Sequence, residues 1–502
     1  MLTPPFFGED LLRHVSGAAA WQGTMTGGRG RPLTLIAQSQ LVGISADLPP
    51  PLGKEAVEPL ALRVERVIPG KSNGDSIKVS LGPTIEAIFR RKREGAKYVM
   101  ERGVVSVNQP AVLPDREGIS VTGSLPYADA DRWHALFGGK DSTGSSLSLA
   151  FDLKIAELDL AGRRLNDVAL RAGTSGNVWI ANVSSKELAG EIAWRPEGLG
   201  RLVARLKYFS LPDASPGRKD EPPPRDLPAL DIIADKLVLH GNDLGKLELV
   251  AVNKVLDWRI ENLVLTGPES TLKAEGIWQS WRLQPRFNVN ITGLEVSDIG
   301  KYLERLGYPR SVQGGTATLK GQLSWAGSPQ SIDFATLSGN LQLDAYKGQF
   351  LKAEAGAARL MGILSAPLAL DFREIVRRGF AFDRVSCGLE ITNGSMTTKD
   401  FRMSGPSAQI EMSGRVDLVN ETQDLKARVE PSVGESSALV VAAVINPVWG
   451  LGALVLQKIL KNPLGQAFAF DYHVTGSWSD PKVERLKADV RTAETRPEPS
   501  LP

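Results

Sequence analysis

The sequence is poor in the residues that build metal sites and disulfides. It contains one cysteine, Cys387, so no disulfide can form within the chain. The four histidines, His14, His134, His240 and His473, lie far apart and show no metal-ligand spacing. The sequence therefore predicts neither a disulfide framework nor a bound metal.

The sequence also lacks an excess of charge of either sign. Lys and Arg number 59 and Asp and Glu number 57, which leaves a net charge of +2. A nucleic-acid-binding protein normally shows a concentrated basic excess, whereas here the two signs are interspersed, so we expect no nucleic acid partner. With 502 residues, 42% hydrophobic and 23% charged, the composition is typical of folded protein with about three domains.

The first residues do not have the pattern expected of a leader sequence. Residues 1–10 have neither a basic region nor an apolar region, so they do not form a signal peptide. The chain begins in what reads as the middle of a domain, and we expect it to be a fragment or a truncated reading frame of a longer protein.

What the sequence has in abundance is alternation of apolar and polar residues with a period of two, which is typical of strands with one apolar face. Short turn signals such as residues 72–75 and 392–395 separate the alternating segments, so we expect a mainly β fold with an antiparallel order of strands. The alternating apolar positions are Leu147, Leu149, Phe151, Leu153 and Ile155; Ile410, Met412, Val416 and Leu418; and Phe468, Phe470, Tyr472 and Val474.

Few segments have helical character. Ser297 is expected to cap a helix from Asp298 to Leu306, which Gly307 ends. Residues 354–364 and 372–378 are also helix-like.

Composition divides the chain into parts. The predicted organisation is a β-rich portion at 1–210, a proline-rich linker at 211–228, a second β-rich region at 229–490, and a disordered tail at 491–502. The second region includes a helical insert at 354–378 and an apolar hairpin at 436–460.

An internal similarity indicates a repetitive construction. Leu263–Ile277 matches Phe401–Arg415, and in both segments a strand enters a Gly-Pro turn and a second strand leaves it. Proline has no backbone N–H, so Gly-Pro fixes the corner of a hairpin. The alternative interpretation is two unrelated hairpins that share common turn chemistry.

Two motifs suggest chemistry but are better explained by structure. Gly70-Lys-Ser-Asn-Gly74 has the spacing of a serine nucleophile elbow, but the following residues alternate as a strand, which favours a hairpin tip. Asp129 and Asp131 form an acidic pair, which we expect to be solvated in a surface loop. We therefore predict no catalytic residue.

Between Glu435 and Lys458 the chain carries no charge. Asn446-Pro447 interrupts this stretch, which favours two short helices in a hairpin. Three interpretations remain open: a plug over the end of the sheet, a tip that touches a membrane, and a transmembrane helix. The candidate residues are Leu439, Val441, Val444, Trp449, Leu451, Leu454 and Leu456.

An ordered series of segments runs through the second half of the chain. The series comprises Ser297–Pro309, Gly314–Pro329, Leu337–Gly339, Leu360–Leu364, Leu370–Phe372, Gly379–Asp383, Gly405–Pro406 and Val474–Pro481. No single motif in it is specific, but the ordered series is. On this series the chain resembles, along nearly its whole length, the YhdP type of AsmA-like protein. Upstream, Leu125-Pro126 with Asp129, Asp131, Arg132 and Trp133 resembles a recurring segment of the same family.

The resemblance implies a long twisted antiparallel sheet curled into an apolar trough that carries phospholipid acyl chains across the periplasm. The resemblance also implies an N-terminal inner-membrane anchor in full-length relatives, and we do not expect residues 1–10 to be that anchor. From the residues alone, the apolar stripe is equally typical of an ordinary sandwich core. The predicted trough-lining residues are Leu147, Leu149, Phe151, Leu153, Ile155, Ile410, Met412, Val416, Phe468 and Phe470.

The functional hypothesis is a phospholipid-transport scaffold between the inner and outer membranes, without cofactor or catalysis. Its expected partners are phospholipid acyl chains and the inner leaflet of the outer membrane, and its expected location is the periplasm. Two alternatives are an assembly factor for outer-membrane proteins, which would use open sheet edges, and a polysaccharide hydrolase, which would need converging carboxylates.

Overall fold

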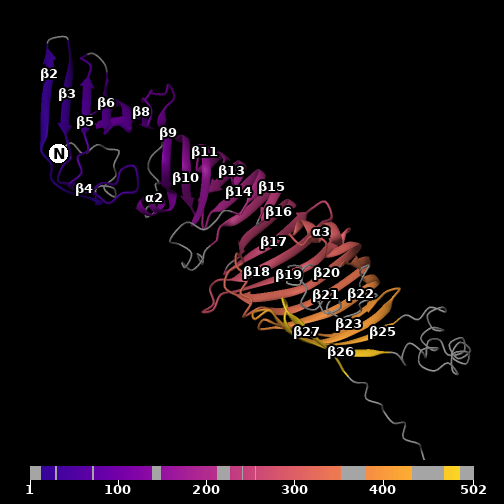
Figure 1. The fold of residues 1–502 in the computed structure, drawn as a ribbon. Helices are drawn as coiled ribbons and strands as arrows, with labels where there is room; N and C mark the ends of the chain where they lie inside the picture. The colour runs from indigo at the N-terminus through magenta and orange to yellow at the C-terminus, as the bar shows by residue number, and fades with distance from the viewer. Residues whose placement is uncertain are drawn as a thin grey trace, which may run out of the picture. The chain divides into compact units, whose positions relative to one another are not determined.

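In the computed structural model of the protein, β-strands dominate and the prediction of a mainly β fold is confirmed (Figure 1). The structure describes residues 13–486 except 29–30, 71–72, 96, 138–147, 212–226, 240, 255, 352–379 and 432–468. The chain divides into two compact units, Met1–Gly241 and Asn242–Pro502.

In the first unit, neighbouring strands pair in chain order from β2 to β15, except that β4 pairs with β1 apart from this series. The strands are β1 (Val15–Gly17), β2 (Trp21–Gly28), β3 (Arg31–Ser39), β4 (Ile44–Ala46), β5 (Leu62–Ile68), β6 (Gly74–Leu81), β7 (Ile85–Glu94), β8 (Lys97–Val107), β9 (Gly118–Asp129), β10 (Leu149–Leu160), β11 (Arg163–Ser175), β12 (Val178–Ser184), β13 (Leu188–Arg195), β14 (Arg201–Ser210) and β15 (Ala229–Leu239).

The sheet of the first unit is antiparallel except at three pairs. β9 lies parallel to both β8 and β10, and β14 lies parallel to β15. Parallel neighbours need a connection that returns the chain to the same end of the sheet. The connections here are residues 108–117, residues 130–148, which include helix α2 (Ala130–Phe137), and residues 211–228.

In the second unit, every described neighbouring pair from β16 to β27 is antiparallel and follows chain order. The strands are β16 (Asn242–Lys254), β17 (Asp257–Thr266), β18 (Ser270–Gln279), β19 (Arg286–Val296), β20 (Val312–Ala326), β21 (Ser338–Phe350), β22 (Phe380–Thr392), β23 (Ser395–Ser404), β24 (Ala408–Asp417), β25 (Thr422–Pro431), β26 (Phe470–Ser477) and β27 (Pro481–Arg485).

Helix α3 (Ile299–Arg305) occupies the connection between β19 and β20. Its cap is Asp298, whose Oδ1 accepts a hydrogen bond from the backbone N of Lys301 at 3.0 Å, so the prediction that Ser297 is the cap was wrong by one residue. The Ser297 hydroxyl instead donates to the carbonyl of Glu269. Gly307 has a φ of +90° directly after the helix, which is the conformation that glycine allows at a helix end. The helix-like segments 354–364 and 372–378 lie outside the described residues.

The internal similarity corresponds to two hairpins with the same register. Leu263 lies opposite Ala274 between β17 and β18, and Phe401 lies opposite Met412 between β23 and β24. Both ladders contain an irregularity at the same place, directly before these pairs: between Ile260 and Leu263 in one and between Thr398 and Phe401 in the other. In both turns the glycine N donates to a carbonyl three residues on, at 2.8 Å for Gly267 and 3.1 Å for Gly405. The two hairpins therefore share one backbone geometry, with the same register and the same turn hydrogen bond.

Candidate functional site

One face of the first unit carries an unbroken row of apolar residues across its strands. Directly opposed residues in neighbouring strands lie on the same face of a sheet. Following the register from β2 to β15 therefore gives one line of side chains, and every member is aliphatic, aromatic or glycine. The row is Gly23, Ala37, Val64, Val79, Ala87, Val105, Val121, Phe151, Ala172, Ala181, Ile192, Ala204 and Ile232.

Four of the predicted trough residues lie on this face. Phe151 is a member of the row, is half-buried, and its ring lies 5.8 Å from that of Trp179. Leu153 and Ile155 are buried at 9% and 4% exposure in a cluster with Leu158, Leu165 and Val168. Leu149 is half-buried at the start of β10. Leu147 lies outside the described residues.

The second unit has a comparable row, which is built of leucine. It runs from β16 to β22 and is uninterrupted by a polar residue. Its central members are half-buried, so their side chains retain contact with the space over the face. The row is Leu247, Leu265, Leu272, Leu294, Leu319, Leu343 and Cys387.

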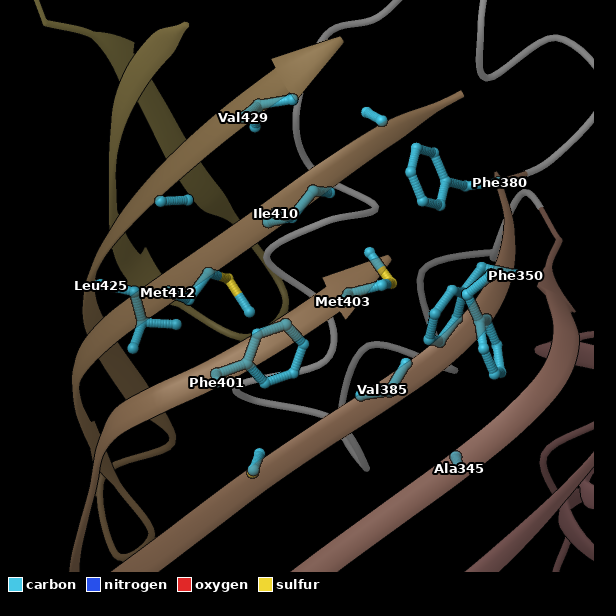
Figure 2. Close-up of a cluster of buried hydrophobic side chains, with 14 of the residues drawn as sticks. Ala345, Phe350, Phe380, Val385, Phe401, Met403, Ile410, Met412, Leu425 and Val429 are labelled. Carbon is cyan, nitrogen blue, oxygen red and sulfur yellow. The ribbon is translucent and has the colours of Figure 1, made fainter. Parts of the chain in front are cut away.

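The other predicted trough residues lie further along the second unit, where the face is more enclosed. Ile410, Met412 and Val416 point to the same side of β24 and are 1%, 2% and 0% exposed. Figure 2 shows Ile410 and Met412 among side chains from neighbouring curved strands, including Phe401 and Leu425. These three residues are therefore packed core residues. Phe470 lies opposite Val429 and is half-buried under the guanidinium of Arg485, and Phe468 lies outside the described residues.

Cys387 and Gln423 lie on this face of the second unit and carry polar atoms. Burial raises the pKa of the Cys387 thiol to about 12, so the thiol stays protonated and unreactive near neutral pH. Gln423 is 5% exposed, and neither its Oε1 nor its Nε2 has a hydrogen-bond partner.

The Gly70–Gly74 motif and the acidic pair Asp129 and Asp131 both have structural roles in the fold. Residues 69–73 connect β5 to β6, which pair antiparallel, so the predicted hairpin is confirmed. The prediction of a solvated loop for the acidic pair was wrong. Asp129 is 8% exposed and accepts from the backbone N of Arg132, and Asp131 in α2 accepts from the N atoms of Ala161 and Gly162. Both carboxylates thus hold backbone in place.

The described residues contain no cluster of three or more His, Cys, Asp or Glu side chains placed to hold a metal ion. In the part of the chain that the structure describes, no helix has both the length and the apolar character needed to cross a membrane. The apolar hairpin 436–460, with Leu439, Val441, Val444, Trp449, Leu451, Leu454 and Leu456, lies outside the described residues.

Sequence reasoning missed the leucine row and the row in the first unit, because a row becomes visible only when the strand register is known. It also missed a charged cluster at one end of β5 to β8, formed by Arg66, Asp75, Arg91 and Tyr98. A signal for this cluster was present. Asp75 takes the place of an apolar residue in the alternation Ile77, Val79 and Leu81.

The model of the family described as YhdP protein matches residues 3–483. The chain is 24% identical, over 511 aligned positions, to a protein of Escherichia coli (strain K12) described as "Intermembrane phospholipid transporter YhdP". The alignment covers 96% of this chain and 40% of that relative, so the chain spans less than half of the relative's length. No solved structure matches the chain.

Proposed function

The chain belongs to the YhdP protein family, and we propose that it transports phospholipids between the two membranes of a bacterial envelope by holding their acyl chains on its apolar rows. In this proposal it acts in the periplasm, supports the permeability barrier of the outer membrane, and performs no catalysis. The name of the Escherichia coli relative favours transport over the assembly of outer-membrane proteins.

The observation that carries the proposal is the continuity of the rows within each unit. Moving a methylene group from an apolar surface into water costs about 0.8 kcal/mol. A polar gap in the path would therefore raise a barrier for each chain that passes it. The row from Gly23 to Ile232 has no such gap, and neither has the row from Leu247 to Cys387. A lipid can then move along either row while its headgroup stays in water, without a cofactor.

The candidate residues differ in whether a lipid acyl chain can contact them without movement of neighbouring side chains. Phe151 and Leu319 are half-buried, so an acyl chain can lie against them as they stand. Ile410, Met412 and Val416 are enclosed, so contact with lipid there needs side chains to move apart. We propose that the half-buried parts of the rows are the principal lipid path.

Photo-crosslinking tests the proposal directly. A photoreactive phenylalanine analogue is placed at Phe151 or Leu319 in the full chain, expressed in a Gram-negative host, and irradiated in cells. The matched controls are Lys154, three residues after Phe151 on β10, and Lys320, next to Leu319 on β20; both are exposed. We expect phospholipid adducts by mass spectrometry at 151 and 319 and background levels at 154 and 320. Equal yields at test and control positions would overturn the proposal.

A further inference from the structure

One charged cluster interrupts the apolar face of the first unit. It is formed by one residue from each of four successive strands: Arg66 on β5, Asp75 on β6, Arg91 on β7 and Tyr98 on β8. Asp75 accepts from Nε of Arg66 at 2.6 Å, from Nε of Arg91 at 2.8 Å and from an Nη of Arg91 at 2.6 Å. Both guanidinium carbons lie about 5 Å from the centre of the Tyr98 ring. The cluster is therefore fixed in place.

The register places this cluster on the same side of the sheet as the apolar row. Arg66 lies opposite Ile77, which lies opposite Phe89. Each of these residues is two positions from a member of the row on its own strand, so its side chain is on the same face as the row. Around them the line is apolar: Met25, Leu35, Ile77, Phe89, Gly103, Ile119 and Leu149 share it with Arg66. A cation thus lies directly beside a surface suited to acyl chains, near the end of the strands where the β5–β6 and β7–β8 hairpins turn.

The cluster has more positive charge than its own anion neutralises. Two guanidinium groups share one carboxylate, and the Asp75 side chain has no exposed surface. Arg66 uses only its Nε on Asp75, and no described residue accepts from its two Nη atoms. Its side chain is 21% exposed and that of Arg91 is 10% exposed, so the outer guanidinium can still be reached. Arg93 lies two residues beyond Arg91 on β7 and is exposed, which adds a second accessible cation.

We propose that Arg66, with Arg91 and Arg93 beside it, binds the phosphate of an anionic phospholipid whose acyl chains lie on the apolar row. Guanidinium groups bind phosphate through paired, charge-assisted hydrogen bonds, and the unused Nη atoms of Arg66 supply such donors. Tyr98 packs against both arginines, and the carboxylate of Asp75 competes with the phosphate for them. The inference rests on the proposed function and adds to it a choice of headgroup at a named place.

Titration calorimetry on the full chain tests this with three probes. Dihexanoylphosphatidylglycerol carries the phosphate and the chains, dihexanoylglycerol carries the chains alone, and glycerol phosphate carries the phosphate alone. The variants are Arg66→Gln, which removes a cation, and Asp75→Asn, which removes the competing anion. The control is Arg90→Gln, which removes an exposed arginine from the neighbouring position of β7 on the other face. Circular dichroism confirms that each variant is folded.

We expect Arg66→Gln to weaken phosphatidylglycerol binding about 3- to 10-fold, Asp75→Asn to strengthen it, and Arg90→Gln to leave it within about 2-fold. Dihexanoylglycerol should bind equally to all four proteins. If glycerol phosphate competes with phosphatidylglycerol, the site recognises the phosphate alone. If it does not compete and phosphatidylglycerol still binds more tightly than dihexanoylglycerol, the site binds the intact lipid.

Asp75→Asn separates this inference from a purely structural role, in which its only effect would be lower stability. Equal binding of phosphatidylglycerol and dihexanoylglycerol, or equal losses in Arg66→Gln and Arg90→Gln, would overturn the headgroup site and leave lipid transport standing. If neither amphiphile binds the wild-type chain, both proposals fail.

Discussion

Gln423 lies directly opposite Val416 on the ladder between β24 and β25, and it is the one polar side chain in a row that is otherwise apolar. The row crosses the second unit from β16 to β26. Its members are Ala251, Ile260, Gly276, Val289, Leu323, Gly339, Ile391, Met396, Val416, Gln423 and Gly476.

Replacing Gln423 by leucine should therefore stabilise the protein. A buried amide without partners costs about 1–3 kcal/mol, and both polar atoms of Gln423 lack one. We expect Gln423→Leu to raise the free energy of unfolding by about 1 kcal/mol or more in urea denaturation. Gln409→Leu, on the exposed side of β24, is the control and should change it little. A lower stability for Gln423→Leu would mean that the amide is satisfied in solution.

A charge on the lipid path should block it. Phe151→Asp places a carboxylate in the apolar row, where an acyl chain cannot solvate it. Crosslinking of diazirine-labelled phospholipid to the first unit should fall severalfold, while the circular dichroism spectrum still shows a β fold. Lys154→Asp on the exposed side of β10 is the matched control. Unchanged crosslinking in Phe151→Asp would count against a lipid role for this face.

Gly414 should be intolerant of any side chain. Its φ is +143°, and a Cβ atom there would lie 2.3 Å from the carbonyl oxygen of Asp424 on the neighbouring strand. We expect Gly414→Ala to lower the free energy of unfolding by about 1–3 kcal/mol, measured by urea denaturation. Gly293→Ala on β19, where a Cβ would meet nothing within 4 Å, should cost clearly less. Similar losses at both sites would contradict the local geometry.

The stability of the first unit should depend on pH through Asp75. Burial raises the pKa of this carboxyl, but hydrogen bonds from Arg91 and Arg66 outweigh burial and hold it below the usual value of 3.8. Because the pKa is lowered in the folded state, ionised Asp75 stabilises that state. This stabilisation is fully present above the unfolded-state pKa and is lost as the pH falls through the folded-state pKa.

Asp75→Asn should therefore lower stability at pH 7, and its difference from wild type should shrink below about pH 4. Urea denaturation from pH 7 to pH 2 measures this difference. Asp152→Asn, at an exposed position of β10, is the control and should follow the wild-type curve. A constant difference across the range would exclude titration of Asp75 as the cause.

The charge-free stretch 436–457 of the apolar hairpin is predicted to be either a membrane-touching tip or a plug on the sheet, or to cross a membrane as a helix. If it is a tip, a lysine at Val441 or Leu454 should abolish binding to liposomes of phosphatidylethanolamine and phosphatidylglycerol and leave the melting temperature nearly unchanged. If it is a plug packed on the sheet, the same changes should lower the melting temperature sharply, and wild-type protein should not bind liposomes. Co-sedimentation and thermal unfolding distinguish the two.

The sequence predicted strands well where the alternation was strict. The segments around Phe151, Ile410 and Phe470 form β10, β24 and β26. They were predictable because the alternation of side chains between two faces is a property of a single strand and does not depend on distant residues. It did not predict the three parallel pairs, since the path of a connection, rather than the strand itself, decides the direction of the next strand. It also assigned Phe151 and Ile410 the same role, although one is half-buried and the other enclosed. That difference arises from the curvature around each strand, which a period of two does not encode.

The repeated hairpin allows the sheet to change length in discrete steps. Each copy adds two antiparallel strands and returns the chain in its original direction, with the same side chains facing the same way. Duplication of one such hairpin would extend a sheet by two strand spacings, about 10 Å. The apolar and polar faces of the sheet would stay on the same sides. Deletion of one hairpin would shorten the sheet by the same amount. The length of such a sheet can therefore change by gain or loss of whole hairpins, whereas gain or loss of a single strand would reverse the direction of every strand downstream.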